Sequence, residues 1–232
     1  MSKEVQQQLN AINGILGNIY SYDYLLRVIT YGSLLTVEGL KTVGQGDGTL
    51  AKFLLEVFEK LTDARFVNRL GGFSASVAWY LAALKNGSST SALLNRGMAA
   101  SMVLYYPMEH IWYFSTFKNK YVHVNSNWWC LWYCRVWLAY VIMDYSGTMI
   151  RIRKLKQKIA GDTEDSKPAL KRELKNEWIW TRVVFCDFVM ALQWSLEAGP
   201  FSDNFISFVG LYGGVVALYL KWRRATVKDK EE

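Results

Sequence analysis

The best candidates for chemical activity in this chain are an adjacent glutamate and histidine near its middle. Glu109 and His110 follow Pro107 and could work together as an acid and a base. The sequence has no Gly-x-Ser-x-Gly elbow that would supply a nucleophile beside them. We therefore expect this pair to make a polar contact that anchors the preceding Tyr-Tyr-Pro segment, and we expect the protein not to be an enzyme.

Two cysteines four residues apart are the second candidate. Cys130 and Cys134 would share one face of a helix, and His110 and His123 are near enough in sequence to make a metal site conceivable. The Cys-x-x-Cys knuckle typical of zinc sites is missing, so we predict buried, inert thiols and no metal. Cys186 brings the cysteine count to three, and this odd number suits a reducing compartment.

Cofactors and nucleic acid are not favoured either. Residues 44–48 are rich in Gly but lack the Lys-Ser/Thr pair of a phosphate-binding loop, so we expect no cofactor. The net charge of +7 could attract nucleic acid or anionic lipid. Because the basic residues flank apolar segments, we expect a phospholipid membrane as the partner and no nucleic acid.

The elements that position these residues are expected to be helices in or on a membrane. The chain has 232 residues, of which 51% are hydrophobic and 15% are aromatic, and only three are Pro. The predicted fold is all-α, with N-terminal amphipathic helices followed by a C-terminal bundle of transmembrane helices that ends in a helical hairpin. The amphipathic region covers residues 1–86.

A basic amphipathic helix is predicted over residues 50–84, interrupted at Gly71-Gly72. Such a helix can insert into one leaflet of a membrane, or its apolar face can pack against the transmembrane helices. The residues that we expect to contact the membrane alternate between apolar and basic. They are Lys52, Phe53, Val57, Lys60, Leu61, Arg65, Phe66, Arg69 and Leu70.

Residues 87–150 form an apolar, aromatic region associated with the membrane. Residues 97–117 contain Pro, Glu and His, so either a crossing or an interfacial segment is compatible with them. Residues 128–150 are long enough to span a bilayer and begin with a pair of Trp residues typical of the interface.

The charge pattern of the last third of the chain predicts which segments cross the membrane and which lie in the cytosol. Residues 151–177 are a highly charged linker, which we expect in the cytosol because of its many Lys and Arg residues. Residues 178–224 form a transmembrane hairpin of two helices, about 178–197 and 204–220, and residues 225–232 are a cytosolic tail. Both termini are expected in the cytosol, in a multi-pass protein.

Four charged residues interrupt the apolar runs. Arg135, Asp144, Arg182 and Asp187 either hold helices together or line a polar pathway, and the second alternative would indicate a small channel or metabolite carrier. Arg135 and Asp144 are candidate partners for the other two.

The final helix carries a close-packing motif. Gly210 and Gly214 form a Gly-x-x-x-Gly face, which by itself is a weak signal for dimerisation.

Several segments together resemble the peroxin-eleven family. They are Asp63–Arg69, Tyr105–His110, the Trp128-Trp129 segment leading to Arg135, and the Gly-rich helix from Phe208 to Trp222. The order of these segments carries the resemblance, which covers roughly residues 20–224.

This resemblance implies a peroxisomal membrane protein that elongates and remodels the organelle membrane before fission, and so controls peroxisome proliferation and biogenesis. It also implies self-association into a homo-oligomer. The helix over about Leu50 to Leu84 would be the membrane-inserting element, with Lys52, Lys60, Arg65 and Arg69 facing lipid. A weaker alternative is that the linker recruits cytosolic fission machinery.

Overall fold

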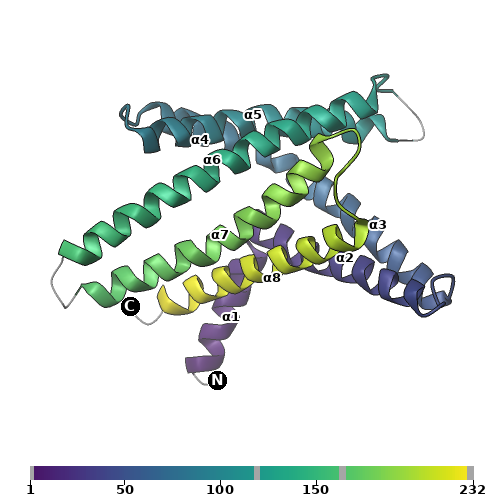
Figure 1. The fold of residues 1–232 in the computed structure, drawn as a ribbon, viewed down its shortest axis with the longest axis horizontal. Coiled ribbons are helices and arrows are strands. Elements are labelled where there is room, and N and C mark those ends of the chain that lie inside the picture. Colours follow the sequence, from purple (N-terminus) through teal and green to yellow (C-terminus); the bar gives the residue numbers. More distant parts are fainter. Residues whose placement is uncertain (1–2, 118–120, 162–165, 229–232) are drawn as a thin grey trace. The chain divides into compact units, whose positions relative to one another are not determined.

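The structure is a computed structural model that describes residues 3–117, 121–161 and 166–228. The described chain is helical, which confirms the all-α prediction (Figure 1). The helices are α1 Lys3–Leu16, α2 Ile19–Thr42, α3 Thr49–Asn68, the 3₁₀ turn η1 Arg69–Gly71, α4 Gly72–Leu84, α5 Thr90–Ser115, α6 Ser126–Gly161, α7 Lys167–Ser195 and α8 Asp203–Lys228.

Short polar residues fix the starts of two of these helices. The side chain of Asn18 accepts hydrogen bonds from the backbone N–H groups of Tyr20 and Ser21, both at 3.1 Å. Ser89 caps α5 in the same way, through the N–H of Ala92 at 3.3 Å. Each cap satisfies backbone donors that the first turn of a helix leaves without a partner.

The chain divides into two compact units. Unit 1 contains α1, α2, α3 and α8, from Met1–Asn68 and Asp203–Glu232, and unit 2 contains η1 and α4 to α7, from Arg69–Ser202. In unit 1, α2 packs against both α3 and α8, and α1 also contacts α8. In unit 2, α6 packs against both α5 and α7, and α4 packs against α5.

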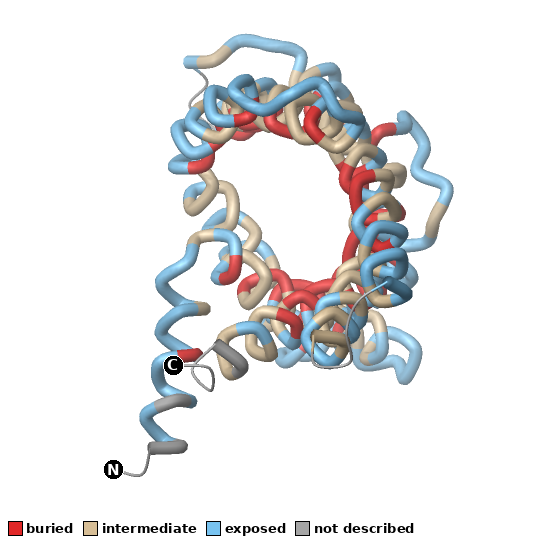
Figure 2. Tube along the Cα trace, turned by 90° about the vertical axis from the view of Figure 1, so that its left-hand side faces the viewer, coloured by how far each residue is buried: buried red, intermediate tan, exposed pale blue. Residues whose placement is uncertain are grey.

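Each helix buries one side. Figure 2 shows buried positions alternating with exposed ones along the helices, as amphipathic packing requires. In unit 2 the buried positions include an aromatic cluster of Tyr105, Tyr106, Tyr133 and Cys134. The rings of Tyr105 and Tyr133 meet edge to face with their centroids 5.7 Å apart, which joins α5 to α6.

The predicted linker is helical where the structure describes it. α6 continues to Gly161 and α7 begins at Lys167, so charged helices replace most of residues 151–177. The reason is an apolar stripe among the charges, in which Ile152 is buried and Leu155 is half-buried. Lys, Arg and Gln are also good helix formers.

The predicted helix over residues 50–84 is divided in the structure. α3 ends at Asn68, the turn η1 follows, and α4 begins at Gly72. A Cβ at Gly72 would overlap the ring of Tyr106, so the start of α4 lies close against α5. Glycine thus permits this contact between helices.

The two helices of the predicted hairpin belong to different units. α7 packs against α6 in unit 2, where the rings of Trp137 and Trp194 stack with centroids 6.1 Å apart. α8 packs against α2 in unit 1. Both helices are longer than expected, since α7 begins at Lys167 and α8 ends at Lys228, and each has its main partner in an earlier helix of its own unit.

Within the described residues, α8 is the one helix that is long and apolar enough to cross a membrane by length and composition, over Asp203–Thr226. The predicted crossings at 128–150 and 178–197 do not reach the same hydropathy. Their many Trp and Tyr residues add little to the index, and each run also contains an Arg and an Asp. The predicted bundle of transmembrane helices is therefore supported for α8 alone.

Candidate membrane-binding surfaces

The inner side of α3 faces α2. Ala51 is buried, and Leu54, Phe58 and Leu61 are half-buried on the same side of the helix. Arg65 lies on this side as well, where its guanidinium donates hydrogen bonds of 3.0 and 3.2 Å to both carboxylate oxygens of Asp23. The apolar face of α3 thus packs within the protein, which is the alternative that the sequence left open.

The outer side of α3 is mainly charged. The exposed charged residues on this side are Lys52, Glu56, Glu59, Lys60 and Asp63. Two positive and three negative charges sum to −1, so this surface offers anionic lipid no net attraction. Phe53 is exposed among these charges, whereas Val57 and Phe66 are half-buried.

Two of the basic residues that we expected to face lipid have ion-pair partners within the protein. Arg65 pairs with Asp23, and the Nη2 atom of Arg69 lies 2.8 Å from the carboxylate of Glu109, which is fully buried. Both arginines therefore join helices within a unit. A bidentate partner or a buried carboxylate satisfies a guanidinium better than a distant headgroup does. Leu70, beside Arg69, is exposed.

The helix after η1 has a different outer surface. α4 contains no charged residue in its 13 positions, and Phe73, Leu81 and Leu84 are exposed on it. At 1.5 Å per residue it is about 20 Å long, shorter than the roughly 30 Å of a hydrocarbon core. An uncharged helix of this length suits the surface layer of a membrane better than a crossing.

The first helix also presents apolar residues to solvent. Val5, Leu9, Ile12 and Leu16 are all exposed, and their spacing of four, three and four residues places them on one stripe. Gln and Asn residues occupy much of the rest of the helix, so its polar side carries little charge. α1 is therefore a short amphipathic helix with an uncovered apolar face.

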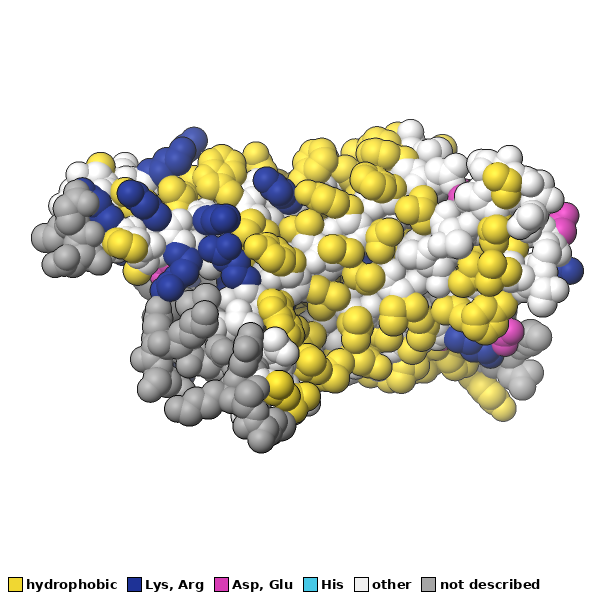
Figure 3. All heavy atoms as spheres, turned by 90° about the horizontal axis from the view of Figure 1, so that it is seen from below, with side chains coloured by type: hydrophobic (Ala, Val, Ile, Leu, Met, Phe, Trp, Pro, Cys, Tyr) yellow, Lys and Arg dark blue, Asp and Glu magenta, His cyan; other side chains and the backbone are white. Residues whose placement is uncertain are grey.

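Helices α6 and α7 both expose large apolar side chains. On α6 the exposed large apolar side chains are Trp128, Trp132, Ile142 and Tyr145, and on α7 they are Trp178, Phe185 and Phe188. Residues 128–150 would cover roughly 33 Å as a helix, close to the thickness of a hydrocarbon core. Hydrophobic side chains are abundant on the molecular surface drawn in Figure 3, where Lys and Arg side chains gather in groups.

The four predicted intramembrane charges do not form one group. Arg135 donates a hydrogen bond of 3.1 Å to the carbonyl oxygen of Ser195, and its guanidinium lies 5.0 Å from the ring centroid of Trp132. Arg182 is exposed, Asp187 is half-buried and Asp144 is buried.

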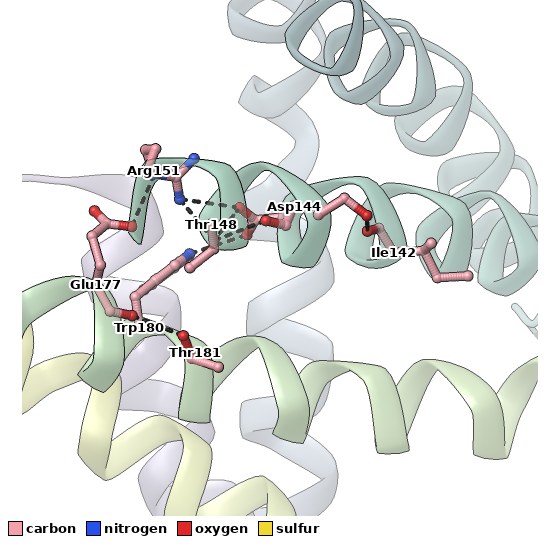
Figure 4. A network of polar contacts seen from close by, with 8 residues as sticks. Ile142, Asp144, Thr148, Arg151, Glu177, Trp180 and Thr181 are labelled. Carbon is pink, nitrogen blue, oxygen red and sulfur yellow. Dashed lines mark hydrogen bonds and ion pairs between the residues drawn. The ribbon is translucent and has the colours of Figure 1, made fainter. Parts of the chain in front are cut away.

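Asp144 belongs to a polar network between α6 and α7 (Figure 4). It accepts a hydrogen bond of 3.1 Å from the indole nitrogen of Trp180 and lies 3.7 Å from a guanidinium nitrogen of Arg151. Arg151 also pairs with Glu177 at 2.9 Å and donates to the hydroxyl of Thr148 at 2.8 Å. This network holds the two helices together, which is the structural role that the sequence offered as one alternative.

A second network surrounds Glu109. Its carboxylate accepts a hydrogen bond from the hydroxyl of Tyr105, four residues earlier on α5, and pairs with Arg69. The neighbouring His110 directs its Nδ1 atom to the carbonyl of Tyr106. Glu109 thus anchors η1 and the Tyr-Tyr-Pro segment, as the sequence suggested.

The two closely spaced cysteines lie near the same cluster. Cys134 is buried, and Cys130 lies 3.8 Å from the hydroxyl of Tyr133, a distance compatible with a weak hydrogen bond. In the part of the chain that the structure describes, no group of three or more His, Cys, Asp or Glu side chains could hold a metal ion. Cys134 belongs to the buried cluster with Tyr105, Tyr106 and Tyr133, and Cys130 packs against it.

The predicted glycine face of α8 packs on α2. A Cβ at Gly210 would lie 2.5 Å from the ring of Tyr31, and one at Gly214 would lie 2.9 Å from a methyl group of Val28. Arg27, which is buried, donates a hydrogen bond of 3.1 Å to the carbonyl of Gly210. The glycines of α8 pack closely against another helix, as the motif predicted, but that helix is α2 of the same chain and not a second copy.

Sequence reasoning missed the inward partners of the basic residues and the outer face of α4. Asp23 and Glu109 are the partners of Arg65 and Arg69, and each pair joins residues at least forty positions apart. Such long-range pairs leave no periodic trace in the sequence. The lack of charge over residues 72–84 was visible and was the available signal for α4.

Comparison with protein-family models gives a match over most of the chain. The family model described as peroxisomal biogenesis factor 11 (PEX11) matches residues 19–222. A search of curated proteins and a search of solved structures gave no match.

Proposed function

The chain belongs to the peroxisomal biogenesis factor 11 family, and from this premise we propose that it elongates and remodels the peroxisomal membrane before the organelle divides. Family membership makes the protein a peroxisomal biogenesis factor of no known enzyme family. The proposal adds a physical mechanism, which is the insertion of short helices into one leaflet.

One observation supports this mechanism above the others. Two short helices, α1 and α4, have exposed apolar side chains and are too short to cross a bilayer. A helix that inserts at the level of the headgroups enlarges one leaflet relative to the other and favours positive curvature. The membrane-inserting role expected for residues 50–84 is thereby assigned to α4, because the apolar face of α3 packs on α2.

Longer helices would hold these elements at the membrane. α8 has the length and composition of a crossing, and the exposed aromatic residues of α6 and α7 suit contact with lipid. In this arrangement the protein is multi-pass, and the basic ends of α6 and α7 face the cytosol by the positive-inside rule. Both termini are proposed to be cytosolic.

Self-association is proposed through the outer stripe of α8. Phe208, Tyr212, Val215 and Tyr219 are exposed at spacings of four, three and four residues, on the side away from α2. A second copy of the chain could pack on this stripe and concentrate the inserted helices. A denser array of inserted helices would also suit recruitment of fission machinery.

A tagged copy expressed under an inducible promoter tests the function. We expect labelled peroxisomes to lengthen as the amount of protein rises, and the protein to stay in the membrane pellet after washing at alkaline pH. Peroxisomes that contain the protein but keep their length at every expression level would contradict remodelling. Release by the alkaline wash would contradict the embedded helices.

The channel or carrier hypothesis gains no comparable support. Arg182 lies on the outer side of α7, and Arg135 and Asp144 have separate partners. A polar pathway needs its charged residues to face a shared interior space. We therefore do not propose transport.

A further inference from the structure

The exposed side of α7 carries basic residues near its start and apolar residues further along. Lys171, Lys175, Trp178, Arg182 and Phe185 are all exposed and follow one another at spacings of four, three, four and three residues. These spacings put them on one side of the helix. The stripe therefore begins with two Lys residues and ends with Phe185, with Trp178 and Arg182 between them, as expected of a helix that enters a membrane from its basic end.

Basic residues surround the indole ring at the centre of this change. The ammonium group of Lys156, on α6, lies 5.5 Å from the ring centroid of Trp178, which is 45% exposed. On α7, Lys175 precedes Trp178 by one turn and Arg182 follows it by one turn. We define these four residues, Lys156, Lys175, Trp178 and Arg182, as the Trp178 cation cluster.

The geometry points to a negatively charged partner that lies at the level of the lipid headgroups. We propose that the Trp178 cation cluster binds the phosphate headgroup of an anionic phospholipid. This inference rests on the membrane position proposed above for α6 and α7. Indole rings prefer the boundary between headgroups and acyl chains, and the side chain of Arg182 can extend back along α7 toward the basic end.

A lipid suits this cluster better than an acidic protein does. The basic positions continue directly into exposed Phe185 on the same stripe, so a ligand that covers the whole stripe needs both a negative charge and an apolar part. An acidic peptide would cover the charges and leave the apolar surface in water. Nearby Arg151 already pairs with Glu177 and is not needed for the site.

Lipid binding by the full-length protein tests the inference. The protein is purified in a neutral detergent and titrated with short-chain phosphatidylglycerol or phosphatidylcholine, and bound lipid is counted by native mass spectrometry. We expect binding of phosphatidylglycerol to weaken at least about tenfold in the triple variant Lys156→Ala, Lys175→Ala, Arg182→Ala, because each of these cations attracts an anionic headgroup.

Two variants control for charge and folding. Lys52→Ala, Lys60→Ala and Lys85→Ala together remove the same charge from exposed positions elsewhere, and we expect this variant to keep its affinity. The variant Lys156→Arg, Lys175→Arg, Arg182→Lys keeps the charge at all three positions and should keep its affinity for phosphatidylglycerol. If the alanine variant does not fold, photoreactive phosphatidylglycerol on the unchanged protein still tests the site by labelling residues 153–156 or 175–182.

Several results would overturn the inference. Equal loss of binding in the two alanine variants would indicate a general charge effect, and labelling confined to other helices would place the lipid elsewhere. Strong binding of polyglutamate without binding of phosphatidylglycerol would indicate an acidic protein partner. Any of these results with peroxisome elongation intact would remove the lipid site and leave the proposed function standing.

Discussion

Arg65 on α3 and Asp23 on α2 form a bidentate ion pair, with donor to acceptor distances of 3.0 and 3.2 Å. The same guanidinium lies 6.0 Å from the ring centroid of Tyr31. Both side chains are largely buried, so solvent weakens the pair less than it would at the surface. The pair fixes the side of α3 that faces α2 and leaves the charged side outward.

Arg65→Ala is expected to lower the stability of the protein rather than its lipid affinity. A hydrogen-bonded charged pair of this kind contributes about 1–3 kcal/mol, and Lys at this position would restore only part of it because it cannot bind both oxygens. Thermal unfolding in detergent measures the change. Lys60→Ala, at an exposed position of α3, serves as the control and should unfold like the wild type. Unchanged unfolding with weaker liposome binding would restore the lipid-facing role of Arg65.

Leu81→Glu is expected to abolish most of the membrane remodelling while the fold persists. Leu81 is 55% exposed on uncharged α4, so a carboxylate there costs little in water but opposes insertion into the membrane. We expect binding to curved liposomes to fall on the order of tenfold and peroxisomes to stay short. Val67→Glu is the matched control, because Val67 is 51% exposed among the charges of α3. Equal elongation by both variants would rule out α4 as the inserting element.

The helices were predictable from the sequence to a greater extent than their partners. The apolar period located α3, α6, α7 and α8, and glycines marked the break before α4, since these are local properties. The direction in which α3 faces was not predictable. It depends on Asp23, which lies forty-two residues from Arg65 in the sequence. A basic amphipathic pattern is the same whether lipid or another helix covers its apolar face.

Glu109→Ala is expected to destabilise unit 2 more than the replacement of both Arg69 and Glu109 by Met does. Glu109 is fully buried, pairs with Arg69 and accepts a hydrogen bond from Tyr105, so deletion of the carboxylate breaks a buried ion pair and its hydrogen bond, at a cost of about 3–5 kcal/mol. The double variant Arg69→Met, Glu109→Met should recover part of this loss. Unfolding by denaturant of all three variants gives the comparison. A double variant less stable than Glu109→Ala would show that the two residues act separately.

Gly210→Ala is expected to destabilise the packing of α8 on α2, whereas Gly39→Ala is not. A Cβ at Gly210 would overlap the ring of Tyr31, at 2.5 Å, but one at Gly39 has no neighbour within 4 Å. Overpacking typically costs about 1–3 kcal/mol, and Ala at an open helical position gains up to about 1 kcal/mol over Gly. Melting temperatures of the two variants should therefore move in opposite directions. A parallel shift would mean that helix propensity, not the contact with Tyr31, decides the result.

Val215→Cys is expected to cross-link two copies of the chain, because Val215 lies on the exposed stripe of α8 that we propose for self-association. Cys130 is half-buried and is replaced by Ala in every variant, whereas Cys134 and Cys186 are buried, so oxidation of this background without a new cysteine should give little dimer. Val209→Cys is the control on the same helix, since Val209 is 6% exposed. Copper phenanthroline treatment of isolated peroxisomes, followed by non-reducing electrophoresis, measures the dimer. If Val215→Cys and Val209→Cys both remain monomeric while peroxisomes elongate, the exposed stripe of α8 is not a contact between copies and remodelling does not depend on one.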